Sequence, residues 1–549
     1  MALTDDELAL LGTLAYLEKS DVLDYDNIND FWNGAYENDG KTLGYVLDKV
    51  ADDSVIADLR SEGKRDQKDS LRITGAEWAD ALEAARGNES IRSLSYVDVD
   101  SFAEDGSRAF CFASGDQAYV VYRGTGSDPT SGGSEWADNF DGLWQSDTHA
   151  QRAALNYAEY AHALTGLDVT VTGHSKGGNK AMYAAVRSPH VARCVSFDGQ
   201  GFGTAFLARH GALVAKRAGV IGAYNLDGDF VSPLLRPIAG KMVWLNGSRA
   251  NGDLLKNHSP IALFGESAAL ASGADRGALS VQVGRFSDFL LHAVPEGQLR
   301  PLADLLGDAA SIALGGVEGD LLSVVAGNPE GLGTLVALLM SYPGTDDLLG
   351  AVEDEAVPGS DLLLDVLGAL GLGPRSPLAR QAGGFALAGM DAAFLGMLLS
   401  EALGLDAGWA GAFARSYAAG RAGIKPGAGP LAGALSPGGS AVVRDFSDEA
   451  RAELRSIAQE VAAEPWFDPS TWDAWYRAEA WFGRLTIDNY QHDLASYFRK
   501  VVDVNDASAQ DIDRIFDRAV ERDAAFARSL SGIPASLASA ARALDAVLG

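Results

Sequence analysis

One serine of this sequence stands in a setting that could make it a nucleophile. Ser175 lies in Gly173-His-Ser-Lys-Gly177, after an apolar stretch, Val169 to Thr172, that reads as a strand and before residues compatible with a helix. Gly-x-Ser-x-Gly on a strand-to-helix turn is a nucleophile elbow, in which a strained turn exposes the hydroxyl. The helix N-terminus beneath it favours developing negative charge. The alternative is a glycine-rich turn with a solvated serine.

Acyl transfer at this serine would also need hydrogen-bond donors for an oxyanion. The elbow itself supplies the backbone N–H of Lys176, and the loop Tyr122-Arg-Gly-Thr125 supplies the second candidate. There Gly124 allows close backbone approach, and Thr125 adds a hydroxyl to its own N–H. An ordinary hairpin exit is the alternative for this loop. The ammonium of Lys176 has two readings, a position beside a substrate phosphate or fatty carboxylate and a solvated side chain.

Three segments in this order resemble a known family. The chain carries Tyr-Arg-Gly-Thr, then Glu135-Trp-Ala-Asp-Asn-Phe140, then Gly-His-Ser-Lys-Gly-Gly. These segments are similar, in the same order, to three segments of the class three lipases: aromatic-Arg-Gly-Thr, Trp-x-x-Asp and Gly-His-Ser-Leu-Gly-Gly. The likeness is closer to a bacterial branch in which Lys follows the serine, and it covers about residues 91–265. It implies an α/β-hydrolase fold, a serine nucleophile with an Asp and a His later in the chain, and hydrolysis of carboxylic esters, often of lipids. It implies no metal and no cofactor.

The order serine, acid, histidine restricts the base. Five histidines follow the serine: His190, His210, His258, His292 and His492. His258, in Lys-Asn-His-Ser-Pro, lies in a loop after the last expected core strand, where a base has freedom to reach the elbow. His292 has apolar neighbours and is expected to be a packed helix residue. His258 is therefore the predicted base.

The predicted acid is Asp229. Residues 220–233 read as a strand that ends in a turn offering carboxylates, and the resembling lipases carry their acid at Asp-x-Val-Pro, a register that Asp229 fits. Asp227 is the neighbour most able to displace it. Asp198, at the end of the previous strand, is the third choice.

Together these residues predict a serine hydrolase that cleaves carboxylic esters, with lipid esters favoured by the resemblance. His258 would take the proton of Ser175, Asp229 would orient the imidazole, and the N–H groups of Lys176 and Thr125 would hold the oxyanion. Esterase, lipase, phospholipase, thioesterase and peptide hydrolase all share this machinery. Two further alternatives are a catalytically silent hydrolase fold that serves as a binding or interaction protein, and a secreted lipase-type effector.

Changes in hydrophobic period indicate the elements that must position these residues. From residue 91 a period of two, interrupted by turn residues, predicts a three-stranded meander. Beyond it, strands at 169–172, 192–197, 220–226 and 242–245 alternate with helical segments. The expected fold class is α/β: an α/β-hydrolase core with a mostly parallel sheet covered on both faces, N-terminal helices, and a large all-helical C-terminal half.

The length of 549 residues predicts three to four domains. Residues 1–90 are expected to be helices packed on the core, without catalytic residues, and 91–270 to be the lipase-like core. The Ala/Gly/Leu-rich region 271–440 is expected to be a lid, an acyl-chain pocket or a structural bundle rather than a transmembrane hairpin, because its apolar runs are short or interrupted by Asp391. Within it, Pro426 to Gly439 reads as a linker, and 441–549 as a helical hairpin region.

The net charge and the number of cysteines restrict the classes of partner that the chain is expected to bind. A net charge of −31, from 44 basic and 75 acidic residues, disfavours nucleic acid and anionic surfaces. A lipid ester substrate would still bring transient contact with a membrane surface, and the oligomeric state is left open. Cys111 and Cys194 are too few for a disulfide framework or a thiolate metal site and are expected to pack as small apolar groups.

The expected location is cytoplasmic, because the acidic N-terminus lacks the pattern of a secretory signal. Trp481-Phe-Gly483 resembles the Trp-x-Gly turn of small helical-hairpin proteins that specialised Gram-positive machines export, so leaderless secretion stays open. An aromatic docking cluster with Trp466, Trp472 and Trp475 explains the same residues.

Overall fold

The structure is a computed structural model of the chain. It describes residues 2–17, 22–23, 42–102, 107–125, 132–247, 253–265, 268–313, 321–354, 392–402 and 404–423. The predicted linker, the helical hairpin region 441–549 and the Trp481-Phe-Gly483 turn lie outside the described residues. The chain divides into two compact units. The first comprises Met1–His292, Leu306–Leu321 and Asp346–Leu364, and the second Ala293–Leu305, Leu322–Thr345 and Asp365–Gly549. The four domain boundaries expected from the sequence stay predictions.

A seven-stranded sheet forms the centre of the first unit. Its strands lie side by side in chain order: β1 (Ser95–Phe102), β2 (Ser107–Ser114), β3 (Gln117–Tyr122), β4 (Asp168–His174), β5 (Val191–Phe197), β6 (Ile221–Leu226) and β7 (Lys241–Leu245). The first three pair antiparallel, as the predicted meander requires, and β3 to β7 are parallel. The α/β class with a mostly parallel sheet is thereby confirmed.

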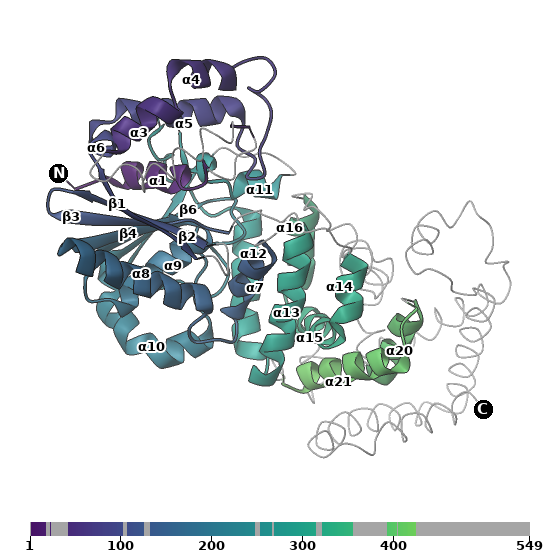
Figure 1. The fold of residues 1–549 in the computed structure, drawn as a ribbon. Helices are drawn as coiled ribbons and strands as arrows, with labels where there is room; N and C mark the ends of the chain where they lie inside the picture. The colour runs from purple at the N-terminus through teal and green to yellow at the C-terminus, as the bar shows by residue number, and fades with distance from the viewer. Residues whose placement is uncertain are drawn as a thin grey trace, which may run out of the picture. The chain divides into compact units, whose positions relative to one another are not determined.

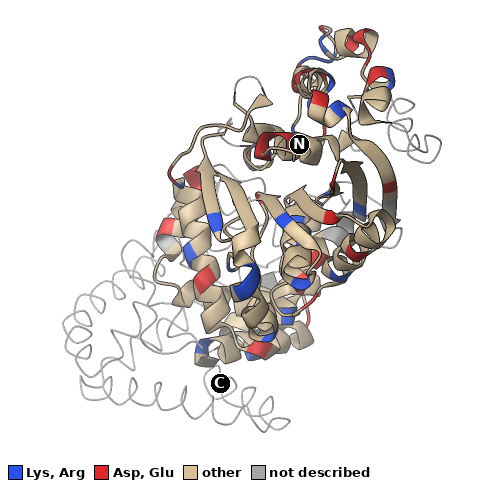
Figure 2. Cartoon of the chain, turned by 90° about the vertical axis from the view of Figure 1, so that its left-hand side faces the viewer, with Lys and Arg blue, Asp and Glu red and all other residues tan. Residues whose placement is uncertain are grey.

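The two faces of the sheet bury different sets of side chains, because side chains alternate along a strand. In β3, Tyr119 and Val121 join one core cluster, whereas Val120 and Tyr122 join the other. In Figure 2 the strands are mostly uncharged, and β3 and β6 carry no charged residue at all. A parallel sheet buried on both faces requires such strands.

Helices that connect successive parallel strands cover one face (Figure 1). They are α8 (His149–Thr165), α9 (Lys176–Arg187) and α10 (Thr204–Arg217), which the η2 turn (Ala218–Val220) follows. Right-handed connections that always step in the same direction along a sheet place their helices on one side. The start of α8 has the side-chain pattern of a capping box, in which Thr148 and Gln151 bond each other's backbone N–H. Both cysteines are buried as free thiols in the core that includes this face, as expected.

The opposite face is covered by N-terminal helices (Figure 1). They are α1 (Asp5–Leu14), α3 (Leu43–Val50), α4 (Asp53–Leu59), α5 (Gly75–Gly87) and α6 (Glu89–Arg92). Helix α1 lies directly on β3, β4 and β5. A capping box of Thr4 and Glu7 starts it, and every residue from Leu8 to Leu14 is buried. The N-terminal segment therefore completes the core of the sheet.

Four further elements lie in a connection of the sheet or follow its last strand. Helix α7 (Gly132–Asp141) lies in the connection between β3 and α8, α11 (Leu254–Asn257) and the η3 turn (Pro260–Leu263) follow β7, and α12 (Ala278–Ala293) comes next. The remaining described elements are helices: α13 (Glu296–Ala313), α14 (Leu321–Gly327), α15 (Pro329–Ser341), α16 (Thr345–Asp354), α20 (Ala392–Ala402) and α21 (Ala407–Gly423).

In the second unit α15 packs closely on α21. A Cβ atom at Gly333 would lie 2.4 Å from the carbonyl oxygen of Phe413, so the absence of a side chain permits this approach. Tyr417 and Arg421 of α21 bond Met340 and Ser341 of α15. Among the described helices, none has both the length and the hydropathy that a membrane span needs.

Asp147, just before α8, joins three helices of the first unit. The carboxylate is buried and accepts hydrogen bonds from Tyr183 and Arg187 of α9 and from Arg209 and His210 of α10, at 2.5 to 2.9 Å. Burial alone would raise the pKa of Asp147, but the hydrogen bonds from Tyr183, Ser146 and His210 and the charge of His210 outweigh it, so this pKa lies well below its usual value.

We expect Asp147→Asn to lower the free energy of unfolding at neutral pH and to weaken its fall in acid. The unfolded chain binds this proton at about pH 4, whereas the folded protein does so only at lower pH. The stability that the carboxylate contributes is therefore present above about pH 4 and is lost as the pH falls below it. Urea denaturation at a series of pH values measures this, with Asp116→Asn, at an exposed turn, as the control. Parallel curves for Asp147→Asn and wild type would contradict it.

Candidate active site

Ser175 occupies a strained turn between β4 and α9. Its backbone has φ 59° and ψ −127°, a conformation that residues with a side chain rarely adopt. Its N–H donates to the carbonyl of Phe197 on the neighbouring strand, and its own carbonyl accepts from Asn179 in α9. A Cβ at Gly177 would lie 2.1 Å from the carbonyl oxygen of Tyr122, so only glycine fits there. The local geometry is that of the elbow expected from the sequence.

The structure brings Ser175, His258 and Asp229 together. Nε2 of His258 lies 2.8 Å from Oγ of Ser175, and its Nδ1 lies 2.7 Å from Oδ1 of Asp229. All three are buried, with 8 %, 8 % and 0 % of their surfaces exposed. They come from the ends of β4 and β6 and from the residue after α11. Asp227, the first alternative acid, is also buried, in the turn that follows β6, but it is Asp229 that contacts His258 at hydrogen-bond distance.

Asp229 is held as a carboxylate. Its oxygens accept backbone hydrogen bonds from Val231 at 3.0 Å and Ser232 at 2.6 Å. Burial alone would raise the pKa of Asp229, but the charge of His258 and the hydrogen bonds from His258, Ser232 and Val231 hold that pKa below its usual value. Because an ionised carboxylate only accepts, Nδ1 of His258 carries the proton and Nε2 is free to accept from Ser175.

The loop that holds Thr125 runs against the elbow. Tyr122 pairs with Gly173 at the ends of β3 and β4. A Cβ added at Gly124 would lie 3.1 Å from Cβ of Ser175 and closer still to the hydroxyl of Tyr16, so the backbone at Gly124 sits directly beside the serine. Thr125, the next residue, is therefore near Ser175, as the predicted oxyanion role requires.

Asn139 of α7 fixes the hydroxyl of Thr125. Its side-chain amide donates to Oγ1 of Thr125 at 2.9 Å, and its backbone carbonyl accepts from the side-chain amide of Gln200 at 2.8 Å. Since Oγ1 accepts this bond, the proton of the Thr125 hydroxyl points elsewhere. Asn139 belongs to the segment that resembles the lipases, but no role was expected for it. Its place three residues after Trp136 in that segment is the sequence signal that could have found it.

Both readings of the Lys176 side chain are wrong. Lys176 is 2 % exposed, and its Nζ lies 2.5 Å from Oδ2 and 3.0 Å from the backbone oxygen of Asp138 in α7. Asp138 also accepts from the Thr148 hydroxyl and the Ala150 N–H at the start of α8. The ammonium is therefore neither solvated nor directed at a substrate, because it ties α9 to α7. The backbone N–H of Lys176, at the start of α9, remains at the elbow.

The other described histidines that follow Ser175 in the chain lie away from it. His292 lies on α12, as expected, but its side chain is exposed rather than packed. Its ring contacts Arg236 at 2.8 Å and the backbone carbonyl of Asp288 at 2.6 Å. His210 bonds Asp147, and His190 is stacked on His162. His492 lies outside the described residues.

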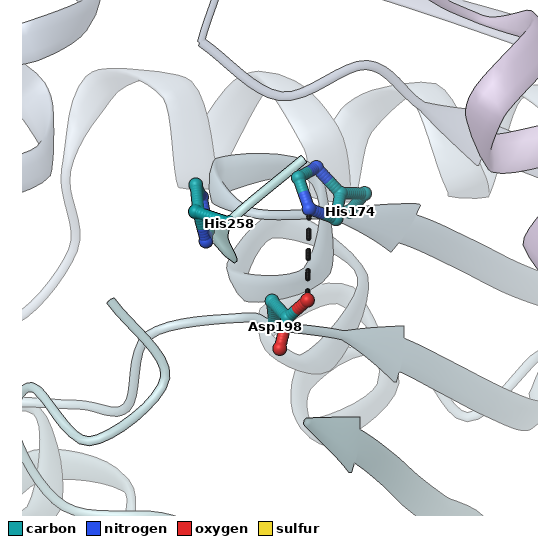
Figure 3. A group of neighbouring side chains, drawn as sticks. All are labelled: His174, Asp198 and His258. Carbon is teal, nitrogen blue, oxygen red and sulfur yellow. Dashed lines mark ion pairs between the residues drawn. The ribbon is translucent and has the colours of Figure 1, made fainter. Parts of the chain in front are cut away.

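Tyr16 and His174 lie beside the candidate triad, although no role was expected for either of them. Nδ1 of His174 lies 3.1 Å from the hydroxyl of Tyr16, and its Nε2 lies 3.8 Å from Oδ2 of Asp198. Figure 3 shows His174 and Asp198 facing each other beside His258. No side chain from residues 1–90 was expected here. Tyr16 reaches the site because it follows α1, which packs on β3, β4 and β5.

His174, Asp198 and His258 offer nitrogen and oxygen donors that lie within 4.8 Å of one another, a combination that can bind a transition metal. However, both ring nitrogens of His258 are engaged, one by Asp229 and the other by Ser175. A metal here would have to displace the serine or the aspartate, so the arrangement fits proton transfer better than metal binding.

A mostly parallel α/β sheet with a serine on a strand-to-helix turn has the arrangement of a nucleophile elbow. In agreement, residues 91–218 match the model of the Mbeg1-like family, a lipase-like family of the class three type. The match runs from before β1 to the end of α10 and includes Thr125 and Ser175, whereas Asp229 and His258 lie beyond it. No protein of curated function matches the chain. The closer likeness to a bacterial branch stays a prediction.

We expect the buried pair of Lys176 and Asp138 to be strongly coupled. Removing one partner of a buried ion pair leaves an unpaired charge and typically costs about 3–5 kcal/mol. Lys176→Met and Asp138→Asn should each lower the free energy of unfolding by roughly this amount, and the double variant should lose less than the sum. Urea denaturation of the four proteins measures the coupling. Single effects that add to within about 0.5 kcal/mol would contradict it.

Proposed function

We propose that the protein is a serine hydrolase that cleaves carboxylic esters through an acyl-enzyme on Ser175. One observation carries this proposal: an unbroken line of hydrogen-bond distances, 2.8 and 2.7 Å, runs from a serine in a strained turn through His258 to Asp229. This is the arrangement that converts a weak nucleophile into a reactive one. The lipase-like family match over residues 91–218 supports the same reaction class.

In the first half of the reaction, Nε2 of His258 takes the proton from Oγ of Ser175 while the oxygen bonds the ester carbonyl carbon. The carboxylate of Asp229 stabilises the imidazolium that forms. When the tetrahedral intermediate collapses, the ester C–O bond breaks and His258 returns the proton to the departing alkoxide. The products of this half are the alcohol and the acyl-enzyme.

Water completes the cycle. His258 takes a proton from a water molecule, whose oxygen bonds the acyl carbon, and the second tetrahedral intermediate releases Ser175 and a carboxylic acid. In both halves the backbone N–H of Lys176 and the N–H and hydroxyl of Thr125 would donate to the oxyanion. The N-terminus of α9 adds its partial positive charge at the same place.

Lipid esters are the substrate class that we propose. The lipase-like character of residues 91–218 supports this choice. That residues 271–440 form a lid, an acyl-chain pocket or a structural bundle stays a prediction. We also propose that the protein is cytoplasmic and that it contacts a membrane surface transiently when it binds a lipid ester.

Ser175→Ala should abolish ester hydrolysis. Without the nucleophile kcat/KM should fall by a factor on the order of 10⁶, or to the background of the assay. The assay uses p-nitrophenyl butyrate and p-nitrophenyl palmitate, and labelling by a fluorophosphonate probe reports the activated serine directly. His258→Gln should also lose labelling, whereas His210→Gln, which removes a buried histidine outside the site, should keep it. If wild type is not labelled, a catalytically silent binding protein becomes the better reading.

The hydroxyl of Thr125 should contribute through the oxyanion alone. We expect Thr125→Val to reduce kcat by about 10²-fold with little change in KM, because one donor is lost in the transition state. Thr125→Ser keeps the hydroxyl and should keep most of the rate. Steady-state kinetics on both variants checks this. A loss for Ser, which lacks the methyl group, but not for Val, which keeps it, would assign the effect to packing of the methyl group instead.

A further inference from the structure

Asp198 is a buried carboxyl that the proposed mechanism does not use. It follows β5 with a positive φ of 49°, which is unusual for a residue other than glycine, and none of its surface is exposed. Oδ1 accepts a hydrogen bond from the backbone N–H of Leu226 at 2.7 Å. Oδ2 has no hydrogen-bond partner in the described part of the chain. A strained and fully buried carboxyl with a free oxygen calls for a specific explanation.

In the segments that the structure describes, His174 carries the second atom without a hydrogen-bond partner, the ring nitrogen Nε2. Its ring lies on the α1 face of the sheet, where Nδ1 is 3.1 Å from the hydroxyl of Tyr16, and that hydroxyl is also 3.3 Å from the carbonyl oxygen of His174. Nε2, like Oδ2 of Asp198, has no hydrogen-bond partner among the described residues. These two atoms face each other at 3.8 Å (Figure 3), about 1 Å farther apart than in a hydrogen bond.

While the imidazole of His174 is neutral, as its burial favours, two arrangements of protons would satisfy both atoms. In the first, Tyr16 donates to Nδ1, and Nε2 donates to an ionised Asp198. In the second, Tyr16 donates to the carbonyl of His174, Nδ1 donates to Tyr16, and a protonated Asp198 donates to Nε2. Both keep the imidazole neutral, so they differ in whether Asp198 carries a charge.

The charge of Asp229 decides between them. Two carboxylates in one buried site repel each other, and the one without compensating donors keeps its proton. Asp229 has three donors, from His258, Val231 and Ser232, whereas Asp198 has one, from Leu226. The other titratable groups that face Asp198 are His174 from β4 and His258 from the residue after α11, with Tyr16 behind His174.

We propose that Asp198 is a positioning residue that keeps its proton: its protonated carboxyl faces Nε2 of His174 at 3.8 Å, so that Asp229 alone of the two carboxyls is negatively charged beside His258. The inference rests on the proposed function, since it assigns the proton that sets the charge around the base. Burial, and next the charge of Asp229, raise the pKa of Asp198 well above its usual value. Burial, and next the charge of His258, lower the pKa of His174.

Infrared spectroscopy tests the proton itself and does not depend on activity. The difference spectrum of wild type minus Asp198→Asn at neutral pH should contain the C=O band of a protonated carboxylic acid, because Asn keeps the shape of the side chain but has no carboxyl. Asp227→Asn, which changes a neighbouring buried carboxyl, is the matched control. It should keep the protonated-acid band, so that this band is absent from the difference spectrum of wild type minus Asp227→Asn. A difference spectrum that shows only carboxylate bands overturns the proposal, whether or not the protein proves to be an esterase.

The pH dependence of kcat/KM gives the second readout. If Asp198 were ionised, its replacement by Asn would remove a negative charge about 5 Å from the base and move the acid midpoint of the profile down by about two pH units. The proposal expects the midpoint of Asp198→Asn to coincide with that of wild type. A downward shift overturns it. The rate of fluorophosphonate labelling against pH serves in place of kcat/KM if no substrate is turned over.

Discussion

The close approach of backbones at one edge of the sheet is the constraint on which the site depends. Where β3 and β4 end, the start of α9 comes so near to Tyr122 that Gly177 cannot carry a side chain, and the loop at Gly124 comes equally near to the carbonyl of His174. These contacts leave Ser175 no relaxed conformation and set its hydroxyl above the sheet. The strain, typically about 1–3 kcal/mol, is offset by the packing of the elements that meet there.

The buried charges around this turn are arranged so that each has a compensating partner. Asp229 faces His258, and Asp138 faces Lys176, with the pKa of each carboxyl held below its usual value by its partner and by further donors despite burial. The first pair can exchange a proton with the serine, whereas the second pair has a structural effect: it joins the elbow helix to α7, which carries Asn139. The position of Thr125 therefore depends on an ion pair that touches neither the base nor the nucleophile.

The sequence predicted the sheet and the members of the candidate triad because both leave local signals. Strands alternate with helices at regular spacing, Gly-x-Ser-x-Gly marks a turn of known shape, and Asp229 and His258 each follow an expected strand. The partner of Lys176 could not be predicted in the same way. A lysine next to a nucleophile has the same local pattern whether it is solvated or paired, and Asp138 reaches it only through tertiary packing. His292 shows the opposite error, since apolar neighbours did not prevent its own position on α12 from facing solvent.

The N-terminal helix gives the strongest example of what tertiary structure adds. Residues 5–14 read as an ordinary buried helix, and Tyr16 after them has no motif around it. Because all connections of the parallel strands lie on one face, the other face must be covered by a separate segment, and α1 provides that cover. The hydroxyl of Tyr16 then meets His174, the residue that immediately precedes the nucleophile. The segment that completes the core thus also controls which protons His174 can share, and through Asp198 it bears on the charge beside His258.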